Sequence, residues 1–186
     1  MNDVVGRAEY KILDAAKALK VIFRDKVVLD IGSSTGGFTE YALHRGAKKV
    51  IAVEKGTNQM KAPLRFDERI ELHEKTNIFE FAPDEPVDLI LADVSFVSLR
   101  DVLAYAKQNL VSDGTEFFVM LKPQFEARPF QLKNGVIKNS KMRREIIADF
   151  ELWLRANGFV IVGKRDNELA GRFGNVERFY HLKLAR

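Results

Sequence analysis

The stretch VVLDIGSSTGGF, residues 27–38, constrains the fold of this 186-residue chain more than any other. Its first three residues form a short apolar run, which is typical of a strand buried on both faces. Gly32, Gly36 and Gly37 then bracket a short polar turn, and a helical pattern follows at once. A strand, a glycine-rich turn and a helix in this order place backbone N–H groups and a helix N-terminus around a polar ligand.

Two well-known phosphate-binding turns do not fit this stretch. A Walker A loop needs Lys directly before its Ser or Thr, and here Phe38 precedes Thr39. The dinucleotide fingerprint needs a second Gly where this chain has Ser34. What remains is an Asp-x-Gly-x-x-x-Gly-Gly pattern that starts at Asp30, followed by Glu54, whose carboxylate can accept hydrogen bonds from a ribose diol. This combination fits S-adenosylmethionine, although a glycine loop without a ligand would read the same way.

Length and composition indicate one globular domain. Hydrophobic residues make up 46% of the chain, which is enough for a core, and no window approaches 18 consecutive apolar residues. The first eleven residues carry charges where a signal peptide needs an apolar segment. The absence of cysteine excludes disulfides and thiolate metal sites and agrees with a cytoplasmic location. The three histidines show no ligand spacing, so we expect no metal, and the lack of a long apolar window predicts no membrane partner.

Positive charge is concentrated between Lys122 and Arg144, where seven basic residues face a single acid. Phe125 and Phe130 lie inside the same stretch. Basic residues interleaved with aromatic rings suit phosphate contacts and base stacking, although a solvated loop and helix face would show the same charges. The candidate RNA-binding residues are Arg128, Lys133, Lys138, Lys141, Arg143 and Arg144.

Apolar periodicity predicts strands and helices that alternate along most of the chain. We expect strands over 27–30, 50–54, 70–73, 87–92, 116–121, 159–162 and 178–184, with the main helices over 6–20, 37–45, 99–110 and 140–157. No element is evident between residues 122 and 140. This order predicts an α/β fold, with a mainly parallel sheet and helices on both faces.

Polar side chains follow several of these strands, at the edge where an α/β sheet binds its ligands. They are Asp30, Glu54, Asn77, Asp93 and Lys122. Asn77 is placed to bind an adenine edge while Ile78 packs on the ring, but a turn-forming Asn is an equally good interpretation.

The segments DIGSSTGGFTEYALHRGAKKVIAVE, KTN, ADVSFVSL, LKPQFE and GNVE together resemble the TlyA-type, hemolysin A-like branch of the FtsJ-like ribosomal RNA methyltransferases. The resemblance runs from about Gly6 to Leu184. It implies a Rossmann-like methyltransferase fold dependent on S-adenosylmethionine, with a seven-stranded sheet whose last strand is antiparallel. It also implies a single FtsJ-like domain over 1–186, in which 1–25 form a helical lead-in and the S4-type RNA-binding domain of the family is lacking.

The resemblance further implies methylation of ribose 2′-hydroxyls in ribosomal RNA through a tetrad of Lys11, Asp93, Lys122 and Glu177. The residues expected to hold S-adenosylmethionine are Asp30, Gly32, Ser33, Ser34, Gly36, Gly37, Phe38, Glu54, Lys55, Asn77, Ile78 and Asp93. Two other functions stay open: a methyltransferase for a substrate other than RNA, and a non-catalytic RNA- or ribosome-binding module. The sequence does not determine the modified nucleotide, the ribosomal subunit or the oligomeric state.

Overall fold

Short apolar runs that alternate with amphipathic helices build one seven-stranded sheet in the computed structural model, which describes residues 7–167 and 174–185. The strand order is β3-β2-β1-β4-β5-β9-β8. The strands are β1 (Val27–Ile31), β2 (Lys49–Val53), β3 (Ile70–His73), β4 (Leu89–Ala92), β5 (Glu116–Leu121), β8 (Phe159–Asp166) and β9 (Arg178–Leu184). The first five are parallel, and β9 runs antiparallel between β5 and β8. The predicted α/β methyltransferase topology, including the antiparallel last strand, is confirmed.

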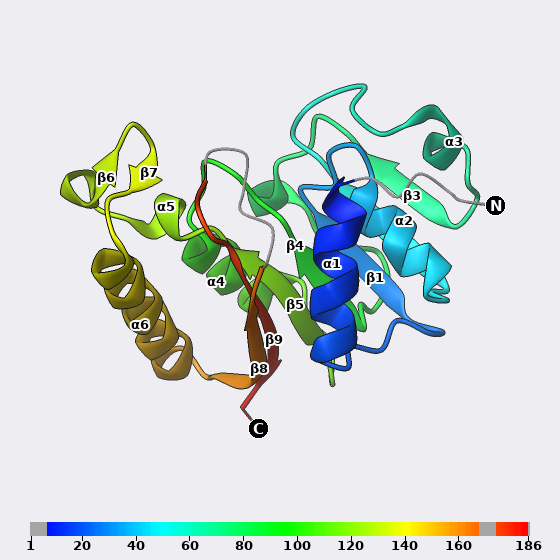
Figure 1. Ribbon diagram of the computed structural model, residues 1–186. Helices are drawn as coiled ribbons and strands as arrows, with labels where there is room; N and C mark the ends of the chain where they lie inside the picture. The colour runs from blue at the N-terminus through cyan, green and yellow to red at the C-terminus, as the bar shows by residue number, and fades with distance from the viewer. Residues whose placement is uncertain (1–6, 168–173, 186) are drawn as a thin grey trace.

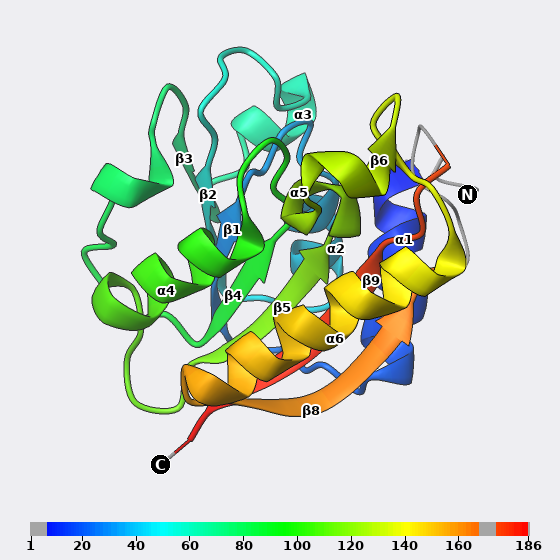
Figure 2. The same cartoon turned by 90° about the vertical axis from the view of Figure 1, so that its left-hand side faces the viewer.

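Helices cover both faces of the sheet, as Figures 1 and 2 show. One face carries α1 (Arg7–Ala18) and α2 (Gly37–His44), and the other carries α4 (Leu99–Asn109) and α6 (Ser140–Ala156). Shorter helices are α3 (Ala62–Arg65), α5 (Pro123–Glu126) and the 3-10 turns η1 (Ile78–Glu80) and η2 (Pro129–Gln131). A small hairpin of β6 (Leu132–Lys133) and β7 (Val136–Ile137) stands beside the start of α6.

The sheet is the centre of the core, and each face packs on its own layer of helices. All five residues of β1 are buried, which explains why its sequence is a continuous apolar run rather than an alternating one. On the face of α1 and α2, the rings of Phe38 and Phe118 both stack on Phe179, with centroids 6.1 and 5.1 Å away. In the opposite layer, Phe150 of α6 packs against Tyr180 of β9. Each such side chain contributes roughly 1.5–3 kcal/mol of burial free energy, so the two layers fix the position of the strand ends.

The structure departs from the sequence-based prediction mainly between residues 122 and 140, where we expected no element. Here Pro123 starts α5, a position that proline favours because the first helical N–H needs no partner. Two smaller differences concern element ends. The first helix stops at Ala18, and Lys20 follows it with a left-handed φ of 53°. Strand β8 continues to Asp166 through an irregularity between Ile161 and Gly163. Residues 168–173, in the stretch between the last two expected strands, lie outside the described residues.

Candidate active site

The glycine turn after β1 brings three segments of the chain together. Gly32 has a φ of 78°, and a Cβ added to it would come within 3.1 Å of the carbonyl oxygen of Asp93 in the loop after β4. Gly36, with a φ of 92°, precedes α2, and a Cβ there would come within 2.5 Å of the side chain of Leu64 in α3. Both positions therefore require glycine for conformation and for space. The turn is held between α3 on one side and the loop after β4 on the other.

A cavity of about 780 Å³ opens at the carboxyl ends of the parallel strands, beside this turn. Its wall combines residues that follow β1, β2, β3, β4 and β5, as expected for the ligand site of an α/β sheet. The lining residues are Ile31, Gly32, Ser34, Val53, Glu54, Lys55, Gly56, Gln59, Thr76, Asn77, Ile78, Phe79, Asp93, Val94, Ser95, Phe96, Val97 and Lys122. Its volume is in the range of sites that enclose a nucleotide-sized molecule.

Seven of the residues expected to hold the cofactor line this cavity: Gly32, Ser34, Glu54, Lys55, Asn77, Ile78 and Asp93. The other five, Asp30, Ser33, Gly36, Gly37 and Phe38, lie behind it. Phe38 is a core residue stacked on Phe179, and Gly37 begins α2. These positions shape the turn from behind rather than face the cavity.

Glu54 is fixed by the backbone of two neighbouring loops. Its carboxylate accepts hydrogen bonds from the amides of Ser34, at 2.9 Å, and Gly56, at 2.7 Å. The side chain of Gln59 lies 3.4 Å from the same carboxylate and 3.2 Å from the Ser34 hydroxyl. A carboxylate oxygen has lone pairs to spare beyond these bonds, so Glu54 can still accept from a ligand diol.

Asn77 has a local structural role in this structure. Its side chain accepts from the amide of Phe79 at 3.3 Å and caps the 3-10 turn η1. Its amide nitrogen lies 3.4 Å from Glu80. The turn-forming interpretation of Asn77 therefore describes its bonds here, while its position in the cavity wall leaves it in reach of a ligand.

Behind the turn, Asp30 is fully buried. Its Oδ2 accepts from the Thr39 hydroxyl at 2.6 Å, while Oδ1 and the buried Ser33 hydroxyl have no partner among the described residues. Burial raises the pKa of Asp30 from 3.8 to about 7, and the nearby charge of Asp93 adds to this effect while Thr39 opposes it.

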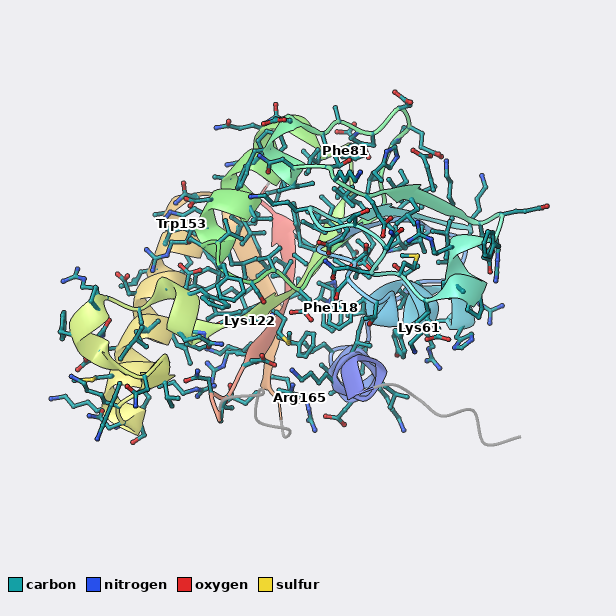
Figure 3. The ribbon with its side chains drawn as sticks, turned by 90° about the horizontal axis from the view of Figure 1, so that it is seen from above. Lys61, Phe81, Phe118, Lys122, Trp153 and Arg165 are labelled. Atoms are coloured by element: carbon teal, nitrogen blue, oxygen red, sulfur yellow. The ribbon has the colours of Figure 1, made fainter. Side chains whose placement is uncertain are left out.

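Lys122 follows β5 and points to the loop after β4, near the middle of the molecule in the view from above (Figure 3). Its Nζ lies 2.7 Å from Asp93 Oδ1 and donates to the Ser95 hydroxyl at 2.8 Å. Only 12% of the Lys122 side chain is exposed, and 24% of that of Asp93. All three residues line the cavity, so an ammonium group and a carboxylate face its interior together.

Lys11 and Glu177 form the second pair of the predicted tetrad. Lys11 Nζ, from α1, lies 2.5 Å from Glu177 Oε2, and the exposed fractions of the two side chains are 12% and 5%. Glu177 directly precedes β9, whose first residue Arg178 pairs with Leu121 of β5. In an antiparallel ladder the next position along brings Glu177 opposite Lys122. The four predicted tetrad residues therefore form two ion pairs, and the strand register puts Glu177 and Lys122 at the same edge of the sheet.

One wall of the cavity is a loop over residues 94–98 that is joined to α5. Phe96 stands on this loop with a left-handed φ of 64° and 91% of its surface exposed. Its ring lies 5.2 Å from that of Phe125. The buried carboxylate of Glu126 accepts from the Ser98 hydroxyl and from the Leu99 amide, at 2.8 and 2.7 Å. An exposed aromatic ring is thus held at the mouth of the cavity in a backbone conformation that bulky residues rarely adopt.

Of the candidate RNA-binding residues, five are exposed: Arg128, Lys133, Lys138, Lys141 and Arg144. They lie on η2, the β6–β7 hairpin and the start of α6. Arg143 differs from them, because 19% of its side chain is exposed and its guanidinium is paired with Asp166 at 2.7 Å. Its Nε also donates to the carbonyl of Val176 at 3.1 Å. Arg143 is therefore engaged inside the protein.

Several cavity residues were not predicted from the sequence: Gly56, Gln59, Thr76, Phe79, Val94, Ser95, Phe96 and Val97. Ser95 and Phe96 belong to the segment ADVSFVSL, which carried the family resemblance, so that motif could have indicated them. Gln59 and Phe79 had no such signal, because their place in the wall depends on how the loops after β2 and β3 fold back.

The comparisons with known proteins show the family of this chain. The family model for FtsJ-like methyltransferase matches residues 4–184. The chain belongs to this family. It is 37% identical over 179 residues to the 23S rRNA (cytidine-2′-O)-methyltransferase TlyA of Campylobacter jejuni, a match that covers 95% of the chain and 70% of that protein. It is also 37% identical to YqxC of Bacillus subtilis, covering 96% of the chain and 65% of that protein's length. A solved structure named as a hemolysin from Streptococcus thermophilus is also similar, with a TM-score of 0.92 and 32% identity. The match covers 100% of this chain and 68% of the hemolysin chain.

FtsJ-like methyltransferases use S-adenosylmethionine, and the cavity residues fit that molecule. Glu54 offers a carboxylate for a ribose diol, and Ile78, Val94 and Val97 offer apolar contact for an adenine ring. Asp93 places a negative charge in the same cavity, which suits a cationic sulfonium.

Two further findings concern other ligands. None of the helices within the described residues combines the length and apolar composition needed to cross a membrane. Within the same ranges no group of three or more His, Asp or Glu side chains is arranged to hold a metal ion.

Proposed function

We propose that this chain is a ribosomal RNA methyltransferase that modifies ribose 2′-hydroxyls and that Lys11, Asp93, Lys122 and Glu177 form its catalytic tetrad. The observation that supports the proposal is that each predicted lysine is paired with a predicted carboxylate, Lys122 with Asp93 in the cavity wall and Lys11 with Glu177. The relatives named as rRNA (cytidine-2′-O)-methyltransferases support the choice of substrate.

The cofactor residues would hold S-adenosylmethionine across the carboxyl ends of β1, β2 and β4. When bound, it supplies a methyl group that is already electrophilic, because a sulfonium is a good leaving group. The protein's remaining task is to align the ribose oxygen with that methyl and to help remove the hydroxyl proton. Asp93 would offer its negative charge to the sulfonium, and Glu54 would bind the ribose hydroxyls of the cofactor.

Lys122 is the residue that we assign to the substrate hydroxyl. Its Nζ has two partners on the protein, Asp93 and Ser95, so the side chain is held in one orientation before RNA arrives. As a neutral amine, Nζ would take the proton of the 2′-hydroxyl; as an ammonium, it would bind the hydroxyl oxygen while the proton leaves to solvent. Partial shielding from water favours the neutral amine that this proton transfer needs, whereas the Asp93 carboxylate favours the charged ammonium that binds the oxygen.

Lys11 and Glu177 would act beside Lys122 as a supporting pair. Lys11 adds positive potential where negative charge develops on the 2′-oxygen, and such preorganised charge stabilises the transition state. Glu177 orients the Lys11 ammonium, just as Asp93 orients that of Lys122. The pairing of β5 with β9 keeps the two ammonium groups on the same edge of the sheet.

RNA would reach the cavity over Phe96 and the basic hairpin region. An exposed ring at the mouth of the cavity offers a stacking surface for the target base, worth roughly 1–3 kcal/mol. The exposed Arg128, Lys133, Lys138, Lys141 and Arg144 would contact the phosphate backbone around the target.

A direct test is to measure S-adenosylmethionine binding by calorimetry and then to incubate the protein with tritiated S-adenosylmethionine and ribosomal RNA from cells that lack this gene. We expect binding and label on ribose 2′-oxygens of RNA, with the site mapped against wild-type RNA. Binding without transfer would favour a non-catalytic RNA-binding module, and label on protein or small molecules alone would favour another substrate. Lys122→Ala, with the exposed Lys17→Ala of α1 as its matched control, ties the label to the proposed site.

A further inference from the structure

Three consecutive residues, 175–177, connect the β6–β7 hairpin to the ion pair of Lys11 with Glu177. We propose that Asn175 and Arg143 are positioning residues that tie the β6–β7 hairpin to Glu177, so that the element expected to hold RNA also fixes the carboxylate that holds Lys11. This inference deepens the proposed function and rests on it for its role in catalysis, whereas the connection itself is a property of the protein alone.

Asn175 binds the hairpin with both ends of its side chain. Its Oδ1 accepts from the amide of Ile137 at 3.0 Å, and its Nδ2 donates to the carbonyl of Gly135 at 3.0 Å. Asn175 is 5% exposed, so these bonds are shielded from water. A buried amide that loses its partners leaves polar groups unpaired, which makes this contact a costly one to break.

Arg143 holds the next residue of the connection. It comes from the first turns of α6, directly after the hairpin, and its Nε donates to the carbonyl of Val176 at 3.1 Å. Its terminal nitrogens reach Asp166 at the end of β8, at 2.7 and 3.3 Å. Arg178, at the start of β9, donates hydrogen bonds to both carboxylate oxygens of the same Asp166, at 2.6 and 3.0 Å. Asp166 thus joins the helix that follows the hairpin to the strand that follows Glu177.

Glu177 is the third residue, and both its backbone and its side chain are held. Its carbonyl accepts from the amide of Asn167 at 2.9 Å, and its carboxylate pairs with Lys11 at 2.5 Å. Asn175, Val176 and Glu177 are each held by their own hydrogen bond or ion pair. A displacement of the hairpin would therefore shift Glu177 through the short backbone segment that joins them. The exposed Lys133 stands on this hairpin, next to the paired residues.

If these bonds had only a structural role, their removal would lower stability, and its effect on turnover would not depend on Glu177. The positioning role predicts more than this, because any effect of Asn175 on turnover must then act through Glu177. The test therefore compares Asn175→Ala in the wild-type background and in the Glu177→Gln background. Asn175→Asp, which keeps the acceptor for Ile137, serves if the alanine variant does not fold.

The first measurement is hydrogen exchange of the protein without RNA. In Asn175→Ala we expect the amides of Ile137 and Asn167 to exchange about tenfold faster, because the loosened segment no longer holds the Asn167 bond. Asn157→Ala is the matched control, since the Asn157 side chain also donates to a backbone carbonyl, that of Trp153, at the far end of α6. A faster Ile137 amide with an unchanged Asn167 amide would overturn the connection.

The second measurement is kcat for RNA methylation at saturating S-adenosylmethionine and RNA. We expect Asn175→Ala to lower kcat about tenfold in the wild-type background and less than twofold in the Glu177→Gln background. An equal fall in both backgrounds would overturn the positioning role. If the wild-type protein labels no RNA at all, the proposed function fails, and the exchange result alone still decides whether the hairpin is tied to Glu177.

Discussion

Lys122 and Glu177 each lie one residue beyond the last pair of the β5–β9 ladder, Leu121 with Arg178. This relationship depends on the direction of β9. Because β9 is antiparallel, the residue before it lies at the carboxyl edge of β5, where a parallel strand would have placed the residue after its end. The same edge receives Asp93 from β4, so the antiparallel last strand is what brings Glu177, late in the chain, to the edge of the sheet where Asp93 and Lys122 lie.

The first prediction concerns Lys122. We expect Lys122→Ala to lower methyl transfer to RNA about 10³-fold, because no other cavity side chain replaces its Nζ at the substrate hydroxyl. Calorimetry should find S-adenosylmethionine binding within about threefold of wild type, since Lys122 is one of many residues around the cavity. Lys17→Ala should match wild type in both assays. Full turnover in Lys122→Ala would remove this residue from the mechanism.

The second prediction concerns Glu177. Glu177→Gln keeps the shape of the side chain but leaves the Lys11 ammonium, which is 12% exposed, without its carboxylate. We expect kcat to fall about tenfold to a hundredfold, and stability to fall by roughly 1–3 kcal/mol, because a shielded charge loses its partner. Glu85→Gln is the control, since Glu85 pairs with Lys49 at the same 2.5 Å distance in a more exposed setting. Urea unfolding and single-turnover methylation would measure the two effects separately.

The third prediction separates stability from function at Phe96. Its left-handed φ of 64° costs folding free energy that glycine would not. We therefore expect Phe96→Gly to keep or raise the melting temperature while it weakens RNA binding about tenfold, since the exposed ring is lost. Phe66→Ala, at a ring that is 81% exposed and outside the cavity lining, should leave RNA affinity unchanged. An RNA dissociation constant that is the same in Phe96→Gly and wild type would contradict the stacking role.

The sequence predicted the parts of the site that follow strands, and it missed those that depend on how loops fold back. Asp93 and Lys122 could be placed because each directly follows an apolar run, and parallel strands deliver their ends to one edge. Phe38 could not be placed, since the same aromatic residue after a glycine turn can face a ligand or the core. Arg143 could not be separated from its exposed neighbours for a similar reason, because its partner Asp166 lies on a strand 23 residues away.

The last prediction concerns the pH dependence of stability. Burial raises the pKa of Asp30 from 3.8 to about 7, so between these pH values the folded protein keeps a proton that the unfolded chain releases. The stability contributed by this proton is complete below about pH 4 and is lost as the pH rises through 7. Asp30→Asn removes the titrating group. From pH 5 to pH 8 we expect the wild type to lose roughly 3 kcal/mol of unfolding free energy that the variant does not lose. Urea denaturation at the two pH values measures this change, with the exposed Asp113→Asn as control. Parallel stability profiles for Asp30→Asn and wild type would show that Asp30 keeps no proton in the folded protein.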